Sequence, residues 1–214
     1  LVENASISGL VKGTFNGTER YVVLAGIKVF SRAVNGNDWD EISPPVRGAQ
    51  GLFLTGIYGS ATAQIGGDAV AVANDHIYAV FQTSQESNRI YKLKDNLGWS
   101  EVYNPDNTYI DGMIGIDNVL IVSTADEKLQ IWENELINPP TQVPGFASGV
   151  KDGVRFGDSP AAPYYIVGST PIIAQLSSDF TTLVPVIFET DSQQPEGVGY
   201  SPFDGGILAV TDRD

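Results

Sequence analysis

The chain has 214 residues, of which 26 are acidic and 12 basic, so its formal net charge at pH 7 is −14. A surface of this charge repels nucleic acid and anionic membranes, which disfavours both as partners. The chain contains no cysteine. This excludes disulfides, thiolate nucleophiles and cysteine-based zinc sites. No apolar run is long enough to span a membrane.

A short apolar run rich in β-branched residues recurs along the chain. Its five copies are Tyr21–Gly26, Ile77–Phe81, Val119–Thr124, Tyr165–Thr170 and Ile207–Thr211. The residues taken as equivalent are Val22, Tyr78, Leu120, Ile166 and Leu208, at offsets of 56, 42, 46 and 42. Such a run, bounded by turn residues, predicts a buried strand. A recurrence every ~40–50 residues predicts a repeat architecture, for which β-propeller blades are the all-β candidate.

Each copy is the second strand of a larger predicted unit, with one strand before it and two after it. We expect blades over 6–46, 68–105, 109–145, 150–188 and an incomplete fifth over 195–214. Asn74-Asp75 and Asp117-Asn118 predict two-residue turns between first and second strands. Blades one, four and five are expected to have longer joins, such as Phe15–Glu19. An insertion is expected around 47–67, although Gly51–Thr55 is an alternative first strand for the second blade.

The predicted fold class is therefore all-β: a single β-propeller domain over 1–214, with four complete four-stranded antiparallel blades and a partial fifth. A propeller that does not close leaves a bare edge strand. The sequence also does not begin with Met. We therefore expect it to be a processed form or a piece of a larger ring.

Three predicted joins between third and fourth strands share a pattern. Each contains Asp or Asn, mostly together with Ser or Gly, and ends on Trp or Leu. They are Ser31 with Asn35–Trp39, Lys94–Trp99 and Ser177–Leu183. These joins resemble degenerate Asp-boxes, Ser-any-Asp-any-Gly-any-any-Trp, of sialidase-like propellers. In that family the acidic or amide side chain caps the turn, glycine takes the positive φ and the aromatic packs under the hairpin. The resemblance thus implies a structural role rather than an active site.

One residue precedes each predicted first strand at an equivalent position: Ser8, Asp68, Asp111, Asp152 and Glu196. First strands line the central channel of a propeller, so these residues are expected to form a ring at one channel mouth that binds a ligand. Carboxylates held together repel one another unless a cation lies among them. Oxygen ligands suit Ca²⁺, so calcium at Asp68, Asp111 and Asp152 is the one cofactor considered. The alternative is that these side chains cap turns or point into water.

Catalytic signals are weak. A sialidase-like site would need three arginines on the substrate, yet the arginines do not recur at equivalent positions in successive units. They are Arg20, Arg32, Arg47, Arg89, Arg155 and Arg213. A Ser-His-Asp triad would have to use His76, the single histidine, and no Gly-X-Ser-X-Gly elbow is present. No catalytic residue is therefore assigned, and an enzyme is disfavoured.

We expect a non-enzymatic recognition or scaffold propeller that presents its channel face to a protein or glycan. A glycoside hydrolase-like propeller, with carboxylates from different blades, is the first alternative. A structural surface or lipoprotein domain is the second. An extracellular or periplasmic location is expected, with the cytoplasm as the alternative. Ligand identity and oligomeric state do not follow from the sequence.

Overall fold

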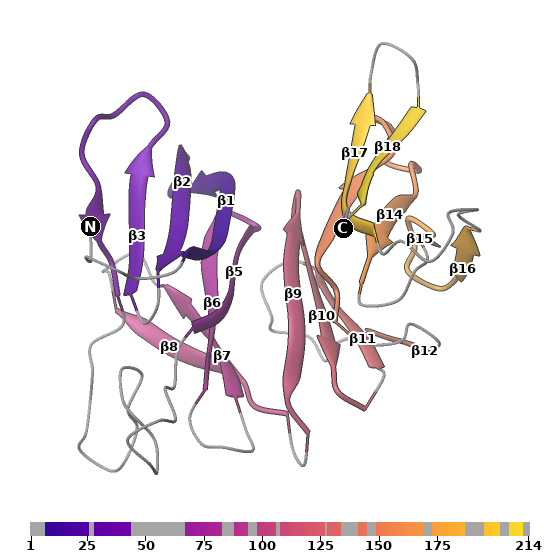
Figure 1. Cartoon of the computed structure of the whole chain (residues 1–214), viewed down its shortest axis with the longest axis horizontal. Coiled ribbons are helices and arrows are strands. Elements are labelled where there is room, and N and C mark those ends of the chain that lie inside the picture. Colours follow the sequence, from indigo (N-terminus) through magenta and orange to yellow (C-terminus); the bar gives the residue numbers. More distant parts are fainter. Residues whose placement is uncertain are drawn as a thin grey trace. The chain divides into compact units, whose positions relative to one another are not determined.

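The computed structural model describes residues 7–25, 28–43, 67–82, 88–93, 98–105, 108–126, 128–133, 141–144, 149–168, 173–186, 195–201 and 206–211. Every regular element in these ranges is a β-strand (Figure 1). The chain divides into two compact units, residues 1–110 and 111–214. None of the described residues forms a helix with the length and hydrophobicity that crossing a membrane requires.

The first unit contains two four-stranded antiparallel sheets in sequential strand order. The first sheet comprises β1 (Ile7–Phe15), β2 (Thr18–Ala25), β3 (Lys28–Ala33) and β4 (Asp40–Glu41). The second comprises β5 (Gly67–Ala73), β6 (His76–Gln82), β7 (Asn88–Leu93) and β8 (Trp99–Tyr103). The first strand of the second sheet is thus β5. The alternative at 51–55 and most of the predicted insertion lie outside the described residues.

The second unit continues the same pattern. Its third sheet comprises β9 (Ile110–Ile116), β10 (Val119–Thr124), β11 (Lys128–Glu133) and β12 (Thr141–Pro144). The fourth comprises β13 (Asp152–Arg155), β14 (Tyr164–Val167), β15 (Ile173–Leu176) and β16 (Leu183–Val186). The described part of the fifth sheet is the pair β17 (Pro195–Ser201) and β18 (Gly206–Thr211). The predicted all-β fold, with four four-stranded sheets and a shorter fifth, is confirmed.

Tight turns join first and second strands in the first three sheets. Ala73 pairs with His76 across Asn74 (φ 47°) and Asp75 (φ 59°), as predicted. Residues 117 and 118 also form a turn, with Asp117 at φ 52°. The longer join expected in the first blade is wrong, because Phe15 pairs with Thr18. Asn and Gly at positions 16 and 17 take positive φ there and match the right-handed strand twist.

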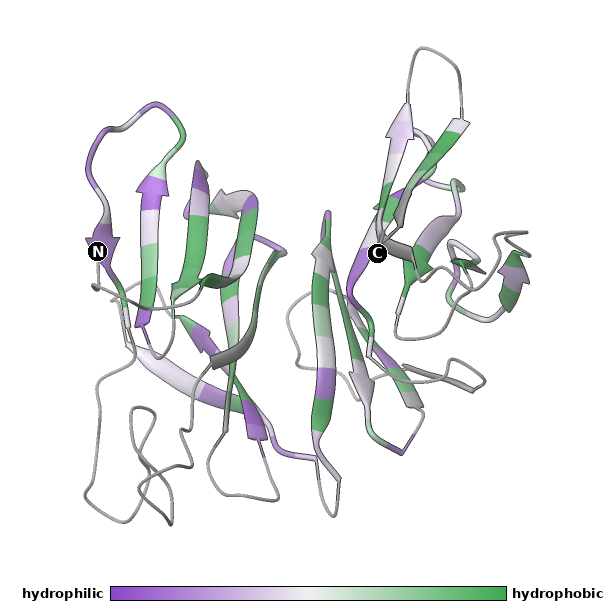
Figure 2. Cartoon of the chain, viewed as in Figure 1, coloured by the Kyte–Doolittle hydropathy of each residue, from purple (hydrophilic) through white to green (hydrophobic). Residues whose placement is uncertain are grey.

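Within the first unit, glycines on β1 allow β5 to approach closely. A Cβ on Gly9 would lie 2.9 Å from Val70, and one on Gly13 would lie 2.5 Å from Val72. The two sheets enclose a core that includes Val22, Leu24, Val29, Ile77, Ala79, Phe81, Tyr91 and Leu93. Figure 2 shows that hydrophobic residues lie along the strands. Face-to-face burial of these strand side chains holds the unit together.

The second unit packs in the same way. A Cβ on Gly153 in β13 would lie 2.7 Å from the side chains of both Ile114 and Ile116 in β9. One core cluster joins the third and fourth sheets and includes Val119, Ile121, Leu129, Ile131, Tyr164, Ile166, Leu176 and Phe180. A smaller one joins the fourth and fifth and includes Val167, Ile173 and Val198.

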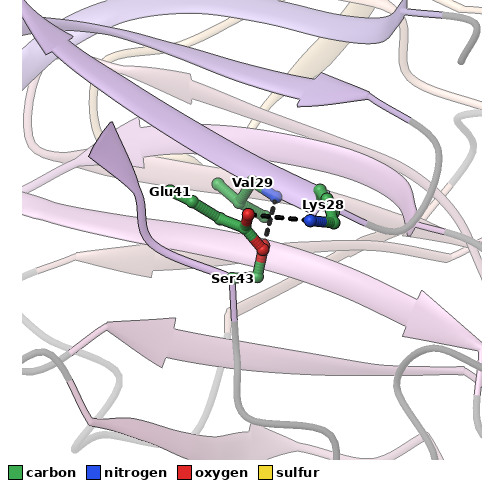
Figure 3. Close-up of polar contacts among 4 residues, drawn as sticks. All are labelled: Lys28, Val29, Glu41 and Ser43. Atoms are coloured by element: carbon green, nitrogen blue, oxygen red, sulfur yellow. Dashed lines mark hydrogen bonds and ion pairs between the residues drawn. The ribbon is translucent and has the colours of Figure 1, made fainter. Parts of the chain in front are cut away.

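A polar cluster fixes the end of β4 on β3. Lys28 Nζ lies 2.8 Å from Glu41 Oε2, the Ser43 hydroxyl donates to Glu41 Oε1 at 3.0 Å, and the Val29 N–H donates to Ser43 Oγ at 3.1 Å (Figure 3). The hydrogen bond from Lys28, and then that from Ser43, lower the pKa of Glu41. Both residues of the short strand β4 pair with β3, the Ile42 N–H donates to the Val29 carbonyl at 2.8 Å, and the side-chain cluster adds to this backbone pairing.

One Asp-box-like turn has the expected capping. Asp179 Oδ1 accepts hydrogen bonds from the Thr181 N–H at 3.2 Å and from the Ser177 and Thr181 hydroxyls. These bonds lower the pKa of Asp179. Phe180 takes the positive φ of 58° and also stacks on Tyr164 at 5.5 Å. The turn therefore departs from the motif, in which glycine takes the positive φ.

The other two joins give less support to the motif. Ser31 lies in β3, where its hydroxyl oxygen accepts from Arg20 Nε rather than capping a turn. The turn of the second join, 94–97, lies outside the described residues, and its Trp99 donates to the Ile42 carbonyl at 2.8 Å. Among the described joins, this capping is found in the fourth sheet, and the Asp-box type of propeller stays a prediction.

Tyr91 carries a buried hydroxyl for which the described residues supply no hydrogen-bond partner. Burial, assisted by the nearby Glu101, raises its pKa to about 12. An unsatisfied buried hydroxyl is destabilising. Tyr91→Phe is therefore expected to raise the free energy of unfolding by about 1 kcal/mol at neutral pH, measured by urea denaturation.

The Tyr91→Phe substitution should also change how the free energy of unfolding depends on pH at alkaline pH. Because the folded state holds the Tyr91 proton up to about pH 12 and an unfolded tyrosine loses it near pH ~10, wild-type stability falls between these pH values. The loss from this group should reach about 2–3 kcal/mol. Tyr91→Phe should lack it, whereas Tyr109→Phe, at a half-exposed position, should retain it. Equal alkaline losses in both variants would contradict this assignment.

Candidate functional site

A pocket of about 470 Å³ lies within the second unit, where the ends of three first strands meet. β9 and the turn after it contribute residues 115–117, β13 and the residues after it contribute 153–155, 157 and 158, and β17 contributes Tyr200. Its titratable side chains are Asp117, Arg155, Asp158 and Tyr200. Pockets with a few convergent polar groups are the usual ligand sites of proteins.

Arg155 is the cation of this pocket, and its side chain is three-quarters buried. Its Nη1 donates to Asp117 Oδ2 over a long 3.3 Å, and its guanidinium carbon lies 5.7 Å from the centroid of the Tyr164 ring. Its Nε is buried, and no acceptor for it occurs among the described residues. The guanidinium thus lies beside a ring and a carboxylate, while the described residues use only part of its donor capacity.

Tyr200, which lines the pocket, packs against other aromatic rings of the second unit. Tyr200 meets Phe156 edge-on at 5.2 Å, and Phe156 contacts Tyr165 at 5.6 Å. Gly157 has φ +94°, and a Cβ there would lie 3.9 Å from the Tyr200 hydroxyl. A glycine at this position permits a backbone conformation that other residues adopt only under strain. The turn after β13 therefore places bare backbone beside the phenol.

Burial also acts on Tyr164, which lies beneath Arg155. It raises the pKa of the Tyr164 phenol, Arg155 opposes that shift, and Asp117 and Glu133 add to it. The ring under the guanidinium is therefore neutral at physiological pH, and a neutral aromatic face favours a stacked cation.

The predicted carboxylate ring involves the starts of the first strands, whereas the pocket lies at the ends of three of them, β9, β13 and β17. Ser8, Asp68 and Glu196 stand where the pairing of first and second strands is irregular, in β1, β5 and β17. Their side chains lie outside what the structure describes. Among the described residues no group of three or more His, Cys, Asp or Glu side chains could hold a metal ion. The complete ring and its calcium stay a prediction.

The side chains of Asp111 and Asp152 both support backbone contacts within the second unit. The Ser123 hydroxyl donates to Asp111 Oδ1 at 2.6 Å and accepts the Val150 N–H at 2.8 Å. Asp152 Oδ2 accepts the Val198 N–H at 2.9 Å, and its Oδ1 accepts the Gly153 N–H at 2.8 Å. Each carboxylate thus helps to fasten the start of the next sheet, as expected of buried backbone donors that need partners.

The sequence analysis does not predict this pocket, and Arg155 stands there among six arginines that do not recur at equivalent positions. A signal exists nevertheless. Asp117, Arg155 and Tyr200 all lie at, or one residue from, the ends of first strands, namely β9, β13 and β17. The predicted ring uses the starts of the first strands instead.

No family model and no curated protein matches the chain. Solved structures do match. A mitotic checkpoint complex structure aligns with a TM-score of 0.61 at 7% identity, covering 98% of this chain and 65% of that chain. The described sheets and these likenesses decide the architecture. The chain is built of β-propeller blades.

Two further propeller neighbours are similar to the same extent. YCF48 bound to a D1 peptide aligns with a TM-score of 0.56 at 13% identity, covering 97% of this chain and 61% of that chain. BBS1N in complex with ARL6DN aligns with a TM-score of 0.63 at 9% identity, covering 99% and 64%. This chain thus spans less than two thirds of each of these propellers. At such low identities the likeness concerns the fold alone.

Proposed function

We propose that these blades form a non-enzymatic recognition module that binds a protein partner through the pocket between β9, β13 and β17. The observation that carries this proposal is the buried Arg155 Nε, for which the described residues supply no acceptor, in a glycine-lined pocket. A small number of fixed polar groups in a concave site gives orientation and specificity to a bound segment.

The neighbours support a protein partner in general terms. Their descriptions name a mitotic checkpoint complex, a protein bound to a D1 peptide and a complex of BBS1N with ARL6DN. Propellers serve many functions, so this support is by analogy of fold. The specific target of this chain is a matter for experiment.

Selection from a random-peptide library on the immobilised protein tests the proposal. We expect enriched peptides whose synthetic forms bind in calorimetry and lose at least about ten-fold in affinity when Asp158→Trp fills the pocket. Asp158 is exposed, so a large side chain is tolerated there. Asp38→Trp, also at an exposed position, is the matched control and should bind as wild type.

Two results would count against a protein-binding pocket. One is a library without any enriched sequence, and the other is a set of peptides that bind Asp158→Trp as tightly as wild type. If a glycan array instead gave a ligand that Asp158→Trp abolished, the pocket would be a glycan site and the protein-partner proposal would be overturned.

A further inference from the structure

We infer that the pocket recognises a carboxylate of its partner, with Arg155 as the anchor. The carboxylate is that of an Asp or Glu side chain or of a C-terminus, since both present the same group. This inference rests on the proposed function and adds the chemistry of the ligand to it.

The first argument is the state of the Arg155 guanidinium. It has five N–H donors, and within the described part of the chain one hydrogen bond is found for it, to Asp117 Oδ2 at 3.3 Å. That length is at the weak end of charge-assisted hydrogen bonds, which usually measure about 2.7–2.9 Å. The cation is largely removed from water but only weakly compensated by the described residues. A ligand anion would supply the missing compensation.

The second argument is the shape of the donor group. The Arg155 guanidinium carbon lies 5.7 Å from the centroid of the Tyr164 ring. The five N–H donors of a guanidinium lie in its plane and point outward from its edge. A guanidinium edge matches the two oxygens of a carboxylate in a bidentate arrangement. Tyr200 lines the same pocket, and its hydroxyl is a further donor. Gly115, Gly153 and Gly157 line the pocket as well.

The third argument concerns charge. Asp117 and Asp158 line the same pocket, so its formal charge with Arg155 is −1, from two carboxylates and one guanidinium. Such surroundings oppose a doubly charged phosphate more than a singly charged carboxylate. The two acidic residues would instead attract a lysine-bearing ligand, which Arg155 would repel. Removing the charge of Asp117 or Asp158 should therefore raise the affinity for a carboxylate ligand and lower the affinity for a lysine-bearing one.

Nuclear magnetic resonance titration of the whole chain tests the inference with four probes. They are acetyl-Gly-Glu-Gly-amide, acetyl-Gly-Gly-Gly with a free C-terminus, acetyl-Gly-Lys-Gly-amide and inorganic phosphate. The Glu probe, the free-carboxylate probe or both should shift the Arg155 Nε–H and the Gly153 and Gly157 amides, and the comparison between them identifies the source of the carboxylate. The Lys probe and phosphate should bind at least about ten-fold more weakly.

Five variants give the sharper test, the last of them as a control. Arg155→Gln should weaken carboxylate binding about ten-fold or more, and Arg155→Lys should restore part of it. Asp117→Asn removes the competing carboxylate, and Asp158→Asn removes the second one, so both should strengthen binding by about three-fold. Arg89→Gln removes an arginine paired with Glu101 at 2.7 Å, outside the pocket, and should leave binding unchanged.

The opposite pattern would overturn the inference: Lys-probe binding that Asp117→Asn and Asp158→Asn weaken, or carboxylate binding that Arg155→Gln leaves intact. The absence of pocket shifts with every probe would overturn it as well. Library peptides that need the pocket for binding but bind equally well without a carboxylate would overturn this inference and leave the proposed function standing. A library with no pocket-dependent peptide would overturn the proposed function.

Discussion

Gly112→Ala is expected to destabilise the second unit by about 3 kcal/mol, which is a large fraction of the stability of an ordinary domain. A Cβ at this position would lie 2.3 Å from the carbonyl oxygen and 2.5 Å from the nitrogen of Val150. Both are backbone atoms, so they cannot move aside as the end of a flexible side chain can. β9 and the chain entering β13 would have to separate.

That separation would also stretch a buried hydrogen bond. The Cβ would lie 2.8 Å from Ser123 Oγ, the atom that accepts the Val150 N–H at 2.8 Å. Leaving a buried backbone donor unsatisfied costs about 1–3 kcal/mol. Steric overlap and loss of this bond therefore act together, and urea denaturation of the variant measures their sum.

Gly199→Ala is the matched control, because Gly199 also lies in a first strand but has no atom within 4 Å of the added Cβ. Its free energy of unfolding should stay within about 0.5 kcal/mol of wild type, or rise slightly because alanine restricts the unfolded chain. If the two variants unfolded at the same urea concentration, the close approach of Gly112 to Val150 would not be a determinant of stability.

The repeat could be predicted because strand formation is signalled locally. Runs of β-branched residues bounded by Asn, Asp and Gly encode a buried strand and its turn together, and Asn74-Asp75 illustrates this most clearly. The Asn16-Gly17 turn carries an equally local signal, because Asn-Gly is typical of a two-residue hairpin turn. The predicted longer join over Phe15–Glu19 overlooks it, although Phe15 and Thr18 pair directly.

The pocket could not be predicted in the same way, because it is a property of packing. Arg155 and Tyr200 come from different sheets, and what brings them to one pocket is the face-to-face packing of β13 and β17. The role of Asp111 also depends on residues far apart in the sequence. Its carboxylate accepts a hydrogen bond from the Ser123 hydroxyl, which in turn accepts one from the Val150 N–H, and no spacing in the sequence indicates this arrangement.

Asn88→Ala is expected to destabilise the first unit by about 3 kcal/mol. Asn88 is buried at the start of β7 and makes two hydrogen bonds with the backbone of Ile110, the last residue of that unit. Its Nδ2 donates to the Ile110 carbonyl and its Oδ1 accepts the Ile110 N–H, both at 2.7 Å. Alanine would leave two buried backbone groups without these partners, each at a cost of about 1–3 kcal/mol.

Hydrogen exchange at Ile110 separates this mechanism from a general loss of packing. In Asn88→Ala the Ile110 amide should lose protection by more than the drop in global stability explains, because its acceptor is gone. The exposed Asn37→Ala should change neither stability nor this amide. The contrary result would be an Ile110 amide that keeps its protection, together with a urea midpoint equal to wild type. Water or another group would then satisfy the Ile110 backbone as well as the Asn88 side chain does, and Asn88 would not stabilise the unit.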